Sequence, residues 1–66
     1  MNNNWNNRTI LVIEDDKYIS HFIDLSLTKE GYHVLTAETA AEGMFLFSSY
    51  RPDIVLLDLG LPDNIR

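Results

Sequence analysis

Two short apolar segments that run directly into acidic residues limit most tightly how this chain can fold. Thr9–Ile13 is rich in β-branched residues and apolar on both faces, and residues 14–16 (Glu-Asp-Asp) follow it at once. Ile54–Leu57 has the same character and is followed by Asp58. Short segments that are apolar on both faces are typical of strands buried inside a parallel sheet. We therefore predict a strand at each segment.

The region after the first acids has the spacing of a helix. Residues 17–30 carry apolar side chains at three- and four-residue intervals, and Gly31 is a suitable residue to end the helix. We expect one face of this helix to be buried, comprising Ile19, Phe22, Ile23, Ser26 and Leu27.

A weaker strand and a second helix complete the middle of the chain. Residues 32–37 predict the strand, and residues 40–49 the helix. Thr39 and Glu42 fit the capping-box pattern, in which a hydroxyl and a carboxylate bind backbone amides at the helix start. Pro52 disfavours helix at the residue before it. The expected buried residues of the second helix are Ala40, Gly43, Met44 and Phe47.

The order strand, helix, strand, helix, strand predicts an α/β fold with a parallel sheet and right-handed crossovers. The carboxyl ends of parallel strands lie at one edge of the sheet, and ligands bind where neighbouring connections leave toward opposite faces. If the first and third strands are neighbours, Glu14, Asp15 and Asp58 converge there.

Three converging carboxylates repel one another, and a divalent cation relieves the conflict. Magnesium is typically held by one or two carboxylates, with water and phosphate oxygens completing its shell. A carboxylate beside such an ion can attack a phosphoryl group and form an aspartyl phosphate, which suits Asp58. Alternatively, Asp15 and Asp16 cap the following helix, and Asp58 begins a turn.

Composition excludes several other classes of function. The net charge is −5 and the five basic residues are scattered, so this segment is a poor candidate for direct nucleic-acid binding. The absence of cysteine excludes disulfides and thiolate metal sites. No apolar run approaches the ~20 residues of a membrane span, and the N-terminus is polar, so we expect a soluble cytoplasmic protein.

Two enzyme classes also fit poorly. No glycine-rich loop follows the first predicted strand, which disfavours dinucleotide binding. Phosphatases with an aspartate nucleophile require Asp-x-Asp at that strand end, and residues 14–16 do not supply it.

The sequence divides into a tail and one small domain. Residues 1–8 include five asparagines and a single isolated aromatic, Trp5, so we expect a flexible tail. Residues 9–66 are expected to form the folded part.

Two stretches resemble the CheY-like receiver domain of bacterial two-component response regulators. They are residues 10–16 (Ile-Leu-Val-Ile-Glu-Asp-Asp) and residues 51–62 (Arg-Pro-Asp-Ile-Val-Leu-Leu-Asp-Leu-Gly-Leu-Pro). The Leu-Asp-Leu-Gly-Leu-Pro-Asp run is most similar to the Kdp-type regulators of the OmpR/PhoB group. The resemblance extends from residue 9 to residue 63 and implies a truncated flavodoxin-like sheet with the strand order 2-1-3, in which the first and third strands are neighbours.

The resemblance also implies a role for each acidic residue. Asp58 matches the phosphorylated aspartate of phosphorelay signalling, and Glu14 and Asp15 match the pair that binds Mg²⁺. Gly60 matches the position whose backbone carbonyl binds the metal. The phosphoryl group would come from a sensor histidine kinase or a small phosphodonor. The kinase would dock on the first helix, at Tyr18, Ile19, Phe22 and Leu25.

The chain also departs from the receiver pattern. Receivers have five strands, and this chain ends after the third, without the fourth-strand Ser or Thr, the fifth-strand Lys or a DNA-binding output domain. We therefore expect a partial receiver that accepts phosphate but is not itself an enzyme, linked by family to transcriptional control. Its third strand would have an unpaired apolar edge, which favours self-association. The alternative is a non-catalytic interaction module that docks a kinase or pairs through this edge.

Overall fold

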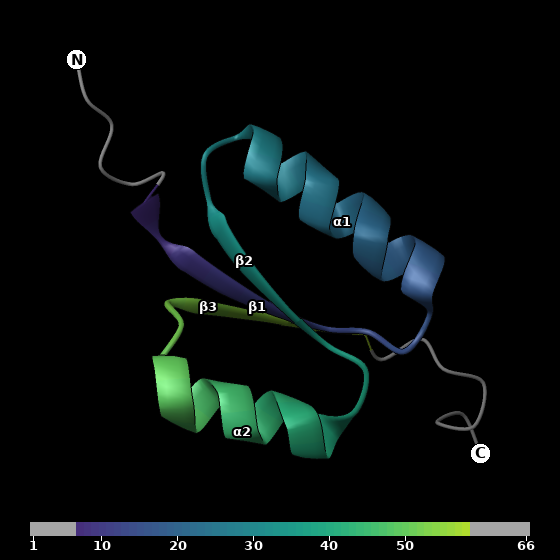
Figure 1. Cartoon of the computed structure of the whole chain (residues 1–66), viewed down its shortest axis with the longest axis vertical. Coiled ribbons are helices and arrows are strands. Elements are labelled where there is room, and N and C mark those ends of the chain that lie inside the picture. The colour runs from purple at the N-terminus through teal and green to yellow at the C-terminus, as the bar shows by residue number, and fades with distance from the viewer. Residues whose placement is uncertain (1–6, 59–66) are drawn as a thin grey trace.

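A computed structural model describes residues 7–58 and places a three-stranded parallel sheet between two helices (Figure 1). The strand order is β2-β1-β3, so the predicted α/β class and order 2-1-3 are confirmed. Neither helix in this range is long and apolar enough to cross a membrane. The elements in chain order are β1 (Thr9–Ile13), α1 (Lys17–Lys29), β2 (His33–Ala37), α2 (Ala40–Tyr50) and β3 (Ile54–Leu57).

The core lies along β1, which is the central strand. Ile10, Leu11 and Val12 are almost completely buried, because β1 has a parallel neighbour on each side and a helix over each face (Figure 1). The backbone pairing of β1 with β2 continues one residue before β1, because the Arg8 carbonyl accepts a hydrogen bond from the His33 amide at 3.0 Å. Residues 1–6 of the predicted tail lie outside the described residues.

The end of α1 is fixed by a Schellman motif, as the glycine suggested. Gly31 has a φ of 100°, a conformation that a residue without a Cβ adopts readily. Its amide donates to the Thr28 carbonyl at 2.9 Å, and the Tyr32 amide donates to the Leu27 carbonyl at 3.2 Å. This tight stop turns the chain directly into β2.

Helix α1 has the predicted helical spacing, but its buried face is rotated about the helix axis relative to the predicted face. Ser20 is buried, and Ile23 and Leu27 are half-buried, whereas Ile19 and Phe22 are 46% and 69% exposed. Ser26, also expected inside, is exposed. The helix packs against β1 and β2, so the side chains directed beyond those strands stay open to solvent.

The expected packing of α2 was also partly wrong. Gly43 is buried, but Met44 and Phe47 are exposed and Ala40 does not reach the core. The glycine permits a close approach: a Cβ at position 43 would lie 2.8 Å from Ile13 Cγ1 and nearer still to Ile13 Cδ1. The helix backbone therefore sits almost directly on β1, and Leu46 takes a half-buried position beside it.

Strand β3 forms one edge of the described sheet. All four of its side chains are between 40% and 54% exposed, although the sequence is apolar throughout. Within residues 7–58 only β1 pairs with it. The predicted unpaired apolar edge is therefore present in the part of the chain that the structure describes.

Replacing Gly43 with alanine tests the close approach of α2 to β1. We expect overpacking in Gly43→Ala to cost about 2–3 kcal/mol, the upper part of the usual range, because the new methyl group would lie within 3 Å of Ile13. Alanine favours a helix over glycine by ~1 kcal/mol, so the free energy of unfolding should fall by about 1–2 kcal/mol. Urea denaturation measures the change.

A second variant separates the clash from other effects of the alanine. Adding Ile13→Val removes the Cδ1 atom nearest to the new methyl group, so it should restore part of the lost stability. A single Gly43→Ala variant as stable as the original chain would contradict the tight contact.

Candidate functional site

The register between β1 and β3 brings the two acidic strand ends together. Ile13 pairs with Leu57, so the next residues, Glu14 and Asp58, leave the sheet side by side. The Asp58 amide donates to the Ile13 carbonyl at 3.2 Å. Carboxylate oxygens of Glu14, Asp15 and Asp58 all lie within 4.8 Å of one another. The structure thus gathers the three acids that sequence reasoning expected to converge.

The opposite end of β3 is tied to β1 by Asp53, a residue that sequence reasoning did not single out. The Thr9 amide donates to Asp53 Oδ2 at 2.9 Å, and the Asp53 amide donates to the Thr9 carbonyl at 2.8 Å. These reciprocal bonds fix where β3 begins, and so fix where Asp58 ends it. A carboxylate directly before an apolar strand and after Pro52 was the available sequence signal.

The acids after β1 divide into two roles. Asp16 is the N-cap of α1, and its Oδ1 accepts the amides of Tyr18 at 2.9 Å and Ile19 at 3.1 Å. The capping alternative therefore applies to Asp16. Asp15 is exposed and directed into the cluster with Glu14 and Asp58.

Glu14 has the most unusual electrostatic environment of the three. It is only 3% exposed, and its Oε2 accepts the Asp16 amide at 2.9 Å. That hydrogen bond lowers the pKa of Glu14, but burial, the side-chain contact with Asp58 and the charges of Asp58 and Asp15 together raise it. The pKa of Glu14 therefore lies above its ordinary value of 4.5.

The cluster suits a hard divalent cation. All three residues offer carboxylate oxygens, the ligand type that magnesium prefers, and their negative charges repel one another without a counter-ion. Among residues 7–58 this is the one group of three or more potential metal ligands with atoms so close together. Gly60, whose carbonyl was expected to join the site, lies outside the described residues.

The side chains expected to dock a kinase lie on the exposed side of α1. Tyr18 is 89% exposed and Phe22 69%, and Ile19 and Leu25 are also open to solvent. An apolar hollow of about 310 Å³ adjoins the acids between α1 and β3, lined by residues that include Ile19, Ile23 and Leu56. Apolar surface therefore flanks the acidic cluster.

Comparison with protein families gives a match over most of the chain. Residues 10–65 match the model of the response regulator receiver domain. This range includes Glu14, Asp15 and Asp58.

Individual proteins with similar sequences are transcriptional regulators or response regulators by name. The chain is 50% identical over 55 residues to the transcriptional regulatory protein KdpE of Staphylococcus aureus. It is 39% identical over 55 residues to the KDP operon transcriptional regulatory protein KdpE of Escherichia coli. It is 46% identical over 54 residues to the cell cycle response regulator CtrA of Brucella ovis. These alignments cover 82–83% of this chain but only 23–24% of each relative, so the chain spans about a quarter of their length.

The raised pKa of Glu14 predicts how stability depends on pH when no divalent cation is present. The folded chain holds the Glu14 proton more tightly than the unfolded chain, so the penalty for ionising Glu14 is absent below pH 4.5. This penalty grows as the pH rises through the raised pKa. Glu14→Gln keeps an acceptor for the Asp16 amide but cannot ionise, so it should be the more stable protein at neutral pH.

Thermal melts of both proteins in EDTA, between pH 4 and pH 8, measure this difference. The two melting temperatures should agree at the acidic end and diverge as the pH rises. A constant difference across the range would show that Glu14 ionises equally easily in the folded and unfolded chains.

Proposed function

This chain belongs to the response regulator receiver domain family, and from that premise we propose that Asp58 accepts a phosphoryl group beside a magnesium ion held with Glu14 and Asp15. The observation that carries the proposal is the approach of the three carboxylates to within 4.8 Å, at the carboxyl edge of the sheet. Buried Glu14 supplies a fixed ligand, and exposed Asp15 and Asp58 leave the site accessible from solvent.

The proposed reaction transfers one phosphoryl group. A carboxylate oxygen of Asp58 forms a bond to phosphorus as the bond between phosphorus and the donor's leaving group breaks. Bound magnesium would supply charge neutralisation for the transferred group. The backbone of β3 holds Asp58 in place through the bond from its amide to Ile13. The Gly60 carbonyl is proposed as a further metal ligand.

The proposed physiological donor is the phosphohistidine of a sensor histidine kinase, and a small phosphodonor can replace it. We assign kinase docking to the exposed side of α1, at Tyr18, Ile19, Phe22 and Leu25, because it presents apolar side chains near the acidic cluster. The chain then acts as a phosphoryl acceptor, not as an enzyme with its own turnover, and works in the cytoplasm. Transcriptional control is proposed from the names of its relatives, without direct nucleic-acid binding by this acidic segment.

Phosphorylation with acetyl phosphate tests the proposed acceptor. In the presence of Mg²⁺ we expect intact-mass spectrometry to detect one added phosphoryl group, and fragment spectra to place it on Asp58. Asp58→Asn should abolish the labelling, and EDTA should strongly reduce it. Asp15→Asn should weaken the dependence on magnesium because it removes a proposed ligand.

Asp53→Asn is the matched control, since it changes the acid at the other end of the same strand and keeps an acceptor for the Thr9 amide. It should be labelled like the original chain. Labelling that survives Asp58→Asn would overturn the assignment of the acceptor.

A second candidate function is an interaction module that pairs through the edge of β3. The observation in its favour is the exposure of four consecutive apolar residues on an edge strand. The adjoining apolar hollow between α1 and β3 adds to the surface that a partner would cover. In this reading a second copy of the chain adds its own β3 to the sheet.

A charge on the strand edge tests this pairing. We expect the chain to be larger than a monomer by multi-angle light scattering, and Val55→Lys to shift it toward the monomer, because a lysine on an edge strand opposes pairing. Phe45→Lys is the matched control: it adds the same charge at an exposed apolar position on α2. If the original chain is a monomer that melts cooperatively, the pairing is excluded. If Val55→Lys and Phe45→Lys dissociate the assembly equally, the contact between copies lies elsewhere.

A further inference from the structure

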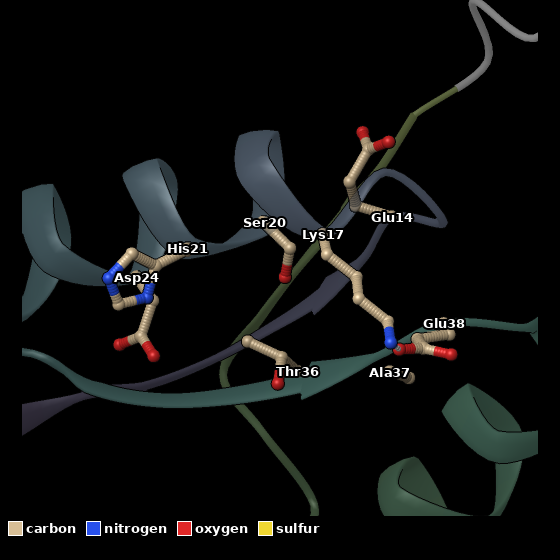
Figure 2. A pocket seen from close by; sticks show the side chains of 8 residues that line it. All are labelled: Glu14, Lys17, Ser20, His21, Asp24, Thr36, Ala37 and Glu38. Carbon is tan, nitrogen blue, oxygen red and sulfur yellow. Dashed lines mark ion pairs between the residues drawn. The ribbon is translucent and has the colours of Figure 1, made fainter.

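A polar hollow of about 220 Å³ lies between α1 and β2, separate from the carboxylate cluster (Figure 2). Glu14 also borders it, but its carboxylate points away from the other lining side chains and is engaged by the Asp16 amide and by Asp58. The side chains that give the hollow its chemistry are Lys17, Ser20, His21, Asp24, Thr36 and Glu38.

Ser20 is the unusual member of this group. It is only 9% exposed, yet its hydroxyl has no hydrogen-bond partner among residues 7–58. Figure 2 shows the hydroxyl directed from α1 into the hollow, toward β2 and Thr36. No fully enclosed side-chain polar atom in the described residues lacks a partner, so the Ser20 oxygen is open to the hollow and not sealed in the core. This hydroxyl is therefore available to hydrogen-bond a ligand or water that enters the hollow.

The charges around the hollow select the type of ligand. In the view of Figure 2, Asp24 lies at one end and Glu38 at the other, with the two hydroxyls between them. Asp24 accepts one hydrogen bond, from the Thr28 hydroxyl at 2.9 Å, which occupies only one carboxylate oxygen. Glu38 contacts Lys17 at 3.9 Å, a long and solvent-exposed ion pair that costs little to break. Two carboxylates therefore face one ammonium, and the hollow favours a cation.

The volume of the hollow and the chemistry of its lining further limit which cations could bind there. The volume is that of about seven water molecules at ~30 Å³ each, which admits one small charged group on a short chain. A divalent metal fits poorly, because the described residues gather three close metal ligands only at the Glu14 cluster. The lining instead combines carboxylates with hydroxyl acceptors, which suits a cation that carries N–H donors.

We propose that this hollow binds an organic ammonium or guanidinium group. The hydroxyl oxygens of Ser20 and Thr36 accept hydrogen bonds from its N–H groups, and the carboxylates of Asp24 and Glu38 balance its charge. Lys17 moves away from Glu38 when the cation enters. The site differs from the phosphoryl acceptor site at Asp58, although Glu14 borders both.

Titration of the isotope-labelled chain with ethylammonium, followed by amide NMR shifts, tests the proposal. We expect saturable shifts at Ser20, His21, Thr36 and Glu38. Tetramethylammonium has the same charge but no N–H donor, so it should shift these amides far less. Equal shifts with both cations would reduce the effect to general charge attraction and overturn the site.

Three variants separate binding from stability. Ser20→Ala should weaken ethylammonium binding by about threefold to tenfold, the effect of one lost hydrogen bond. Asp24→Asn should also weaken it, because it removes one of the two negative charges that balance the cation. Glu30→Gln, which removes an exposed acid outside the hollow, should leave binding unchanged. Without ligand, Ser20→Ala should melt at the same temperature or higher, because it removes a hydroxyl that has no protein partner. A lower melting temperature would show that the hydroxyl has a structural role and would contradict the proposal.

The natural source of the cation is distinguished by two probes with the same guanidinium group. N-acetylarginine amide represents a small molecule, and the peptide acetyl-Gly-Arg-Gly-amide represents a partner protein's side chain; each carries the guanidinium as its sole charge. Tighter binding of the peptide identifies a protein partner, and equal or tighter binding of N-acetylarginine amide identifies a small molecule. Failure of both guanidinium probes and of ethylammonium to bind overturns the site.

Discussion

The parallel pairing of β1 with β3 is the constraint on which the acidic site depends. Asp53 and Thr9 lock one end of the pair, and the Asp58 amide binds the Ile13 carbonyl at the other. A slip of one residue would turn the side chains of β3 to the opposite faces and move Asp58 away from Glu14. These bonds thus hold the carboxylates close together despite the repulsion between their charges.

Much of this arrangement could be predicted because each element carries a local signal. The bounds of β1 and β3 match the two segments that are apolar on both faces, and Gly31 marks the end of α1. Alternating strands and helices with short connections predict a parallel sheet but leave more than one strand order open. The resemblance to receiver domains supplied the order 2-1-3, and with it the expected closeness of Glu14 to Asp58.

The side-chain environments could not be predicted in the same way. Hydrophobic period shows which side chains share a face of a helix but not which strands that face covers. Ile19 and Phe22 were therefore placed inside, although α1 packs mainly against β1 and β2. Asp15 and Asp16 have the same side chain, so composition does not distinguish their roles. The path of the backbone at the start of α1 does: it places Asp16 at the helix cap and Asp15 in the acidic cluster. The environment of Ser20 depends on the hollow formed where α1 packs against β2, and the hydrophobic period of α1 alone does not reveal it.

The exposed edge of β3 also determines what kind of assembly the chain can form. Two copies joined edge to edge would be related by a two-fold axis, and each would use the same strand to bind the other. Such a contact is self-complementary and consumes both apolar edges at once. Pairing of β3 with β3 would therefore stop at a closed pair, whereas addition of β3 to the other sheet edge, β2, would leave an open edge on every copy.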